Sequence, residues 1–189
     1  SSGSGAVQSL TVGTVSNVDA AGSVLARGTV TGAVNQISNG NLNQTIEVGS
    51  VRGGSPLEVR SDASVQGSIS QSAAGSAGGG QDIQVGSIIN SRGNAATKAT
   101  VIGNTLQNQE NSQNVQQKLS VGTVDGSRVQ AVTEVATSGN VNQTARNANN
   151  SVQNIAIGSV ENTGGVISTR ALVTGNLNQS VDGGRANQT

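Results

Sequence analysis

Gln8-Ser9-Leu10-Thr11-Val12-Gly13-Thr14-Val15 decides the fold, because close copies of this octet return along the whole chain. The later copies are QTIEVGSV from Gln44, QDIQVGSI from Gln81, QKLSVGTV from Gln117 and QNIAIGSV from Gln153. Their glycines recur 36, 37, 36 and 36 residues apart, at Gly13, Gly49, Gly86, Gly122 and Gly158. A fixed period of this length is typical of a protein built from stacked structural repeats.

A second set of glycines keeps the same period and is followed, four residues later, by Gln. The glycines are Gly32, Gly67, Gly103, Gly139 and Gly175, and the glutamines are Gln36, Gln71, Gln107, Gln143 and Gln179. We therefore predict a single β-solenoid domain over residues 8–189, after a flexible lead-in at residues 1–7. The five predicted repeats are residues 8–43, 44–80, 81–116, 117–152 and 153–188.

Alternation of side chains within each repeat predicts strands. In the octet, Gln8, Leu10 and Val12 share one inward face, and a kink at Gly13 lets Val15 return to that side. A second strand precedes the second glycine, although Thr105 interrupts its apolar column and the neighbouring Leu106 suggests a local register slip. The prediction is an all-β, amyloid-like fold of five stacked rungs, with parallel in-register sheets and at least two strands per coil.

Glutamine occupies two inward columns, at the start of each octet and after each second glycine. The first column is Gln8, Gln44, Gln81, Gln117 and Gln153. Burying an amide costs free energy unless the amide is hydrogen-bonded. Identical amides stacked in register can satisfy one another, as in Asn and Gln ladders. We therefore predict that both columns are structural.

A column of outward-facing charges changes sign at every repeat: Arg27, Asp62, Lys98, Glu134 and Arg170. Stacked rungs would place these side chains about 4.8 Å apart, where opposite charges attract and like charges repel. Exposed pairs contribute only about 0.2–1 kcal/mol each, so we expect this ladder to select the register rather than to hold the fold together.

The composition excludes several classes of function. The chain has no Phe, Trp, Tyr, His, Cys or Met, and its ten basic and ten acidic residues balance. The absence of His and Cys removes the usual metal ligands and the His- or Cys-dependent nucleophiles. The lack of aromatic platforms and of a basic cluster argues against nucleic acid, and no apolar run is long enough for membrane insertion. We predict no catalytic, metal or cofactor-binding residues and no enzymatic activity.

The ends of the predicted stack carry no recognisable cap, and Asn187-Gln188-Thr189 repeats Asn43-Gln44-Thr45, where an octet begins. Uncapped solenoid ends present unpaired strand edges, and a head-to-tail contact that does not close produces a filament. The expected partner is therefore a second copy of the chain. Because five rungs is an odd number, simple stacking would place Arg170 of one copy beside Arg27 of the next.

The tandem repeats, the Gly-rich turns and the GAVNQ, GNLNQ and GNVNQ segments (from Gly32, Gly40, Gly175 and Gly139) resemble bacterial functional amyloids of the curlin and Fap type. This resemblance, in style over nearly the whole chain, implies a secreted subunit that polymerises outside the cell into biofilm matrix or surface fibres. It also implies a nucleator or a secretion-channel protein as a further partner.

Three alternatives remain open from the sequence. The chain could be a segment of a larger β-solenoid adhesin that binds a glycan or a surface. It could be an ice-binding solenoid, but only Thr29-Val30-Thr31 supplies the required Thr-x-Thr pattern. Its polar, Gly-rich composition could also indicate disorder, against which the in-phase β-branched columns and the zero net charge argue.

Overall fold

The computed structural model describes residues 6–18, 22–126, 130–182 and 186–189. These residues form four parallel sheets and no helix, so the prediction of an all-β solenoid with stacked parallel sheets is confirmed. Each coil contributes one strand to every sheet, which gives four strands per coil where the sequence required at least two. The described part of the chain also has no helix with the length and hydropathy that a membrane span requires.

We name the sheets A to D in the order in which the chain enters them. Sheet A comprises β1 (Ala6–Val12), β5 (Leu42–Val48), β9 (Gly79–Val85), β13 (Val115–Val121), β17 (Ser151–Ile157) and β21 (Ala186–Gln188). Sheet B comprises the two-residue strands β2 (Val15–Ser16), β6 (Val51–Arg52), β10 (Ile88–Ile89), β14 (Val124–Asp125) and β18 (Val160–Glu161).

The other two sheets hold the second half of each coil. Sheet C comprises β3 (Ser23–Thr31), β7 (Glu58–Gln66), β11 (Asn94–Ile102), β15 (Gln130–Ser138) and β19 (Val166–Thr174). Sheet D comprises β4 (Val34–Asn39), β8 (Ile69–Ala74), β12 (Thr105–Glu110), β16 (Val141–Arg146) and β20 (Leu177–Asp182). Of the lead-in expected at residues 1–7, residues 6 and 7 belong to β1 and residues 1–5 lie outside the described residues.

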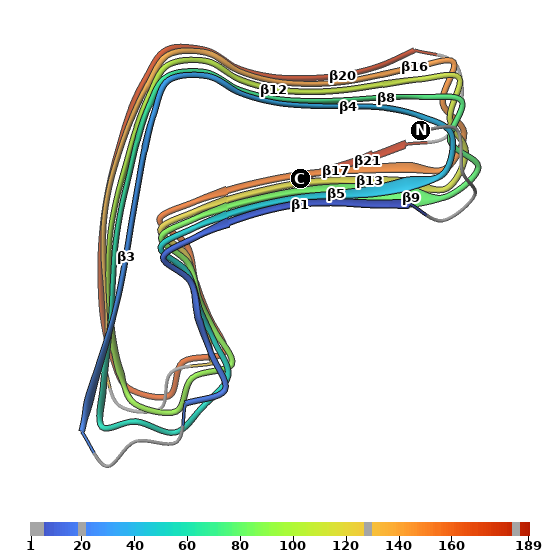
Figure 1. Cartoon of the computed structure of the whole chain (residues 1–189). Coiled ribbons are helices and arrows are strands. Elements are labelled where there is room, and N and C mark those ends of the chain that lie inside the picture. Colours follow the sequence, from blue (N-terminus) through green and yellow to red (C-terminus); the bar gives the residue numbers. More distant parts are fainter. Residues whose placement is uncertain (1–5, 19–21, 127–129, 183–185) are drawn as a thin grey trace.

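Each coil has an angular outline with two arms (Figure 1). The strands of sheet C run along the left side and turn at the upper corner into sheet D, and sheet A runs back beneath sheet D. Sheet A then bends sharply into sheet B, which runs down beside sheet C. One arm is therefore a D–A sandwich and the other a C–B sandwich.

Glycine is required at both bends. Gly122, at the bend from sheet A into sheet B, has a φ of +58°, and a Cβ there would lie 2.2 Å from Val135 Cγ2 on sheet C. Gly67, at the bend from sheet C into sheet D, has a φ of +144°, and a Cβ would lie 2.1 Å from the Gly32 carbonyl oxygen of the preceding coil. Other residue types strain this backbone and meet neighbouring atoms, which explains why both glycines recur in every coil.

The aliphatic interior divides between the two arms. Ile46, Ile83 and Leu119 belong to a cluster where sheets A, C and D meet. Val51 and Ile88 of sheet B belong to a second cluster with residues of sheet C. Val15 packs against this second cluster, as the kink at Gly13 predicts.

The register slip expected at Thr105 is wrong. Thr105 pairs directly with Ile69 and Val141 and is 3% exposed, whereas Leu106 faces outward and is 38% exposed. Two residues further on, the Gln107 side chain donates a hydrogen bond to Gln71 of the preceding coil and accepts one from Gln143 of the following coil. A slip would break both amide contacts, so the column tolerates a threonine instead.

Candidate assembly interface

The first glutamine column forms a continuous amide ladder through sheet A. In each step the Nε2 of one glutamine donates to the Oε1 of the glutamine one coil earlier. The donor–acceptor distances are 3.0 Å for Gln44 to Gln8, 2.9 Å for Gln81 to Gln44, 3.0 Å for Gln117 to Gln81, and 2.8 Å for Gln153 to Gln117. Gln188 extends the ladder by a further step of 3.0 Å to Gln153.

The second glutamine column forms the facing ladder in sheet D. Its steps measure 2.9 Å for Gln71 to Gln36, 3.0 Å for Gln107 to Gln71, 2.8 Å for Gln143 to Gln107, and 2.9 Å for Gln179 to Gln143. The amides also bridge the two sheets. Gln81 Nε2 donates to the Asn108 carbonyl oxygen at 3.1 Å, and Gln107 Nε2 donates to the Lys118 carbonyl oxygen at 3.0 Å. These contacts explain how the D–A sandwich can bury the amides of the two ladders.

Both ladders have the same direction, so the two ends of the stack differ. At the N-terminal end, no described coil precedes Gln8 and Gln36, and their Nε2 groups donate to backbone carbonyl oxygens instead of to a further glutamine side chain. At the C-terminal end, among the described residues, no amide donates to the Oε1 of Gln179 or Gln188. One end therefore presents amide donors and the other presents amide acceptors in the same columns.

The backbone edges and the core columns are also open at both ends. Strands β1 to β4 are the outermost strands at one end, and β18 to β20 lie at the other. Ile167 is 50% exposed on β19, whereas Ala131 and Ala95, the inner residues of its column, are 0% and 2% exposed. The described residues include no segment that covers these edges, so the ends are available to a further coil.

The charge column lies in register on sheet C. Arg27 pairs with Asp62, Asp62 with Lys98, and Glu134 with both Lys98 and Arg170. Only the first step brings charged atoms of this column within 4.0 Å in the described chain, at 3.9 Å between Arg27 Nε and Asp62 Oδ2. Both side chains are mostly exposed, so the contact adds little stability.

Sequence reasoning missed a partly buried charged cluster on the outer face of the bend between sheets A and B. Arg52 of β6 forms an ion pair with Glu47 of β5, and its Nη2 lies 3.9 Å from Asp82 Oδ2 on β9. Gln84 Nε2 donates to the same Asp82 oxygen at 2.8 Å. Burial raises the pKa of Asp82, although Gln84, Lys118 and Arg52 act in the opposite direction. Alternation alone assigns these octet positions to solvent, and the repeat spacing contains no signal for the direction of the bend.

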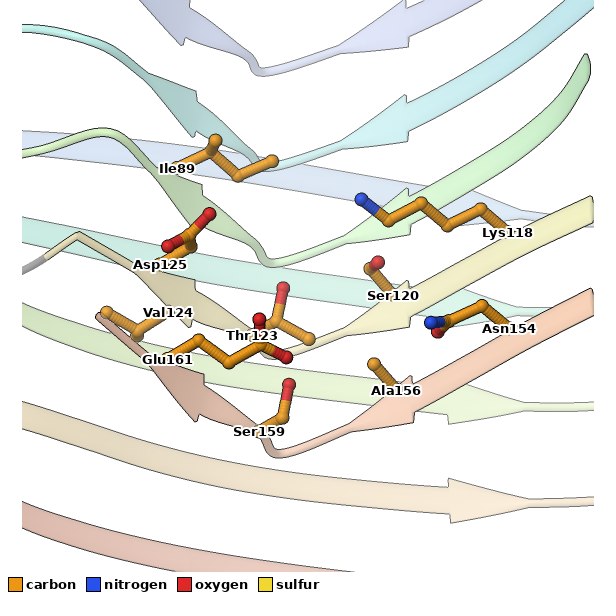
Figure 2. A pocket seen from close by; sticks show the side chains of 10 residues that line it. All are labelled: Ile89, Lys118, Ser120, Thr123, Val124, Asp125, Asn154, Ala156, Ser159 and Glu161. Carbon is orange, nitrogen blue, oxygen red and sulfur yellow. The ribbon is translucent and has the colours of Figure 1, made fainter. Parts of the chain in front are cut away.

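The same bend forms a pocket of about 140 Å³ further along the stack. Figure 2 shows Lys118 and Asp125 extending from opposite sides of the bend, with Glu161 one coil beyond Asp125. The pocket lining is polar, and no group of three acidic, His or Cys residues in the described chain is placed to hold a metal ion.

No protein-family model, curated protein or solved structure matches the chain, so a function must follow from the geometry of the chain itself.

Proposed function

We propose that this chain is a structural subunit that self-assembles head to tail into a cross-β fibre. The observation that carries the proposal is the complementarity of the two ends. Both ends present the same columns in the same register. The N-terminal end of the stack offers amide donors, and the C-terminal end offers amide acceptors. A second copy stacked in register would continue the four sheets and, at Gln179, the second glutamine ladder.

The side chains at the two ends also fit. Val12 of an incoming copy would stack on Ile157, Val15 on Val160, and Val30 on Val173, because each pair shares a column. Aliphatic residues therefore meet aliphatic residues across the junction. Burying these exposed faces, together with new backbone hydrogen bonds, would drive elongation.

We further propose that the fibre is extracellular, as biofilm matrix or a surface filament, and that the chain is not an enzyme. The support is the resemblance to curlin-type and Fap-type subunits and the absence of His and Cys from the sequence. On this proposal the principal partner is another copy, with a nucleator or a secretion-channel protein as a further partner.

The test is assembly of the purified chain, followed by electron microscopy and fibre diffraction. We expect unbranched filaments with a reflection near 4.8 Å along the fibre axis. A stable monomer at high concentration would contradict the proposal.

Two adjacent substitutions in β19 give a matched control. Val173 is half-buried in an inward column, and Leu172 faces outward and is 61% exposed. Val173→Lys would bury a charge at the junction and should abolish filaments, whereas Leu172→Lys adds the same charge on the outward face of β19, where it stays in solvent, and should permit them. Circular dichroism of both monomers would verify that each still folds.

A second candidate function is supported by the pocket between sheets A and B. On this reading the chain is part of a larger β-solenoid adhesin, and the polar lining around Lys118 and Asp125 binds a glycan. A glycan array probed with the monomer tests this reading. Binding that is lost in Lys118→Ala, from a chain that forms no filaments, would favour the adhesin over the fibre.

A further inference from the structure

Sheet A has six strands, whereas each of the other sheets has five. The additional strand, β21, begins a sixth coil by pairing Ala186–Gln188 with Ser151–Gln153. Thr189 continues the pairing, because its backbone N–H donates to the Gln153 carbonyl at 2.9 Å and its carbonyl accepts from the Ile155 N–H at 3.0 Å. At this end of the stack, sheet A therefore extends one strand beyond the other three sheets.

Residues 186–189 occupy a position that a second copy would also need. The register places Gln188 in the column of Gln8, so residues 186–189 stand where residues 6–9 of an incoming copy would lie. Both segments cannot pair with β17 at once. One of them must leave sheet A at every junction.

We infer that β21 of one copy keeps this position and replaces residues 6–9 of the next copy, whose chain enters sheet A from Leu10 onward. This inference rests on the proposed head-to-tail assembly. At the junction, Gln44 of the incoming copy donates to Gln188 Oε1 in place of Gln8 Oε1, so the ladder remains continuous.

Side-chain identity favours β21 over residues 6–9. Asn187-Gln188-Thr189 has the same sequence as Asn43-Gln44-Thr45, the segment of the incoming copy on which it would stack, so identical side chains meet in all three columns. Val7-Gln8-Ser9 shares only the glutamine with that segment, and Val7 is 68% exposed.

Both segments are already paired within their own copies before they meet. Gln179 Nε2 donates to the Thr189 carbonyl oxygen at 3.1 Å, in addition to the pairing of β21 with β17, and residues 6–9 pair with β5. Displacing either segment therefore breaks intramolecular contacts, and the identical side chains decide which one stays.

Cysteine pairs distinguish the two arrangements cleanly, because the chain has no cysteine of its own. If β21 holds the position, Asn187 of one copy lies beside Asn43 of the next, and oxidised filaments of the Asn43→Cys/Asn187→Cys variant should give a ladder of covalent multimers. The Cα atoms of neighbouring strands lie about 4.8 Å apart, within the range that a disulfide spans.

The matched variant is Val7→Cys/Val152→Cys, which would cross-link only if residues 6–9 displace β21. In both variants the two positions lie four coils apart within one copy, too far for an intramolecular disulfide. We expect this second variant to remain monomeric on a non-reducing gel. All four side chains are exposed, so neither pair disturbs the interior.

Cross-linking of Val7→Cys/Val152→Cys alone would overturn the inference. Filaments that cross-link in neither variant would also overturn it, while leaving head-to-tail assembly intact. If the unmodified chain forms no filaments, the proposed function fails and the inference fails with it.

Hydrogen exchange of unmodified filaments gives an independent measurement that needs no substitution. We expect the amides of residues 186–189 to be protected and those of residues 6–9 to exchange. Deleting residues 186–189 should reverse this, because residues 6–9 can then occupy the vacant position. Protection of residues 6–9 in the complete chain would overturn the inference.

Discussion

Gln117 lies directly above Gln81 in sheet A, and its Nε2 donates to Gln81 Oε1 across 3.0 Å while both side chains are 1% exposed. Gln153 in turn donates to Gln117 Oε1 at 2.8 Å. Each interior amide is therefore both donor and acceptor along the stack, and removing one member leaves buried groups on two neighbouring coils without partners.

We expect Gln117→Ala to lower the free energy of unfolding of the monomer by about 2–4 kcal/mol, because unsatisfied buried polar groups cost roughly 1–3 kcal/mol each. Gln116, one residue earlier, faces solvent, and Gln116→Ala should change the free energy by less than about 0.5 kcal/mol. Urea denaturation followed by circular dichroism compares the two. Equal losses would show that the ladder contributes no special stability.

The glycine at the bend from sheet A into sheet B should be intolerant of any side chain. A Cβ at Gly122 combines a positive φ with a 2.2 Å approach to Val135 Cγ2, so we expect Gly122→Ala to cost about 3–5 kcal/mol. Gly75 has a φ of +67° with no atom within 4 Å of an added Cβ, so Gly75→Ala should cost only about 1–2 kcal/mol. Thermal unfolding measures the stability of both variants. Similar losses of stability would mean that the positive φ, and not the contact with Val135, determines the cost.

The stacking of coils could be predicted because it depends only on spacing. Glutamines and glycines that recur in phase must lie in columns once the coils stack, and parity assigns Gln8 and Leu10 to the same face. The same reasoning places Arg27 above or below Asp62 without any knowledge of the coil's outline.

The outline itself could not be predicted. Glycine at position 13 permits a bend, but its spacing does not say toward which face sheet B turns. The chain turns so that the outer faces of sheets A and B approach each other, which buries Glu47 and encloses Asp82. The repeat of the octet start at residues 187–189 is visible in the sequence, but the pairing of β21 with β17, and so its competition with residues 6–9, is not.

Asp82 should make stability depend on pH. Its pKa is raised by burial, so the folded state binds a proton more tightly than the unfolded chain, whose value is near 3.8. The contribution of Asp82 to stability is then fully present below about pH 3.8 and is lost as the pH rises through the folded pKa.

The substitution Asp82→Asn isolates this contribution. The free energy of unfolding of the unmodified chain, minus that of Asp82→Asn, should fall as the pH rises through this window and become constant above it. Denaturant titrations at a series of pH values measure the difference, and Asp62→Asn, at a mostly exposed side chain, controls for the loss of one negative charge. A difference that is independent of pH would show that burial does not govern this carboxyl group.

The charge column predicts how salt should affect assembly, because Arg170 is its last member and Arg27 its first. In a fibre, Arg27 of one copy would stack on Arg170 of the preceding copy about 4.8 Å away, and these like charges repel. Arg27→Gln removes the repulsion and forfeits only the exposed 3.9 Å contact with Asp62. We expect elongation at low salt to become faster by up to about fivefold, the equivalent of about 1 kcal/mol.

Arg60→Gln is the matched control. Arg60 is exposed on β7, so this substitution removes the same charge one coil away from the end. Elongation rates from seeded assembly should differ between the two variants at low salt and converge near 1 M salt, where the screening length is about 3 Å. If both substitutions accelerate elongation equally at low salt, the effect reflects net charge, and Arg27 does not stack on Arg170 at the junction.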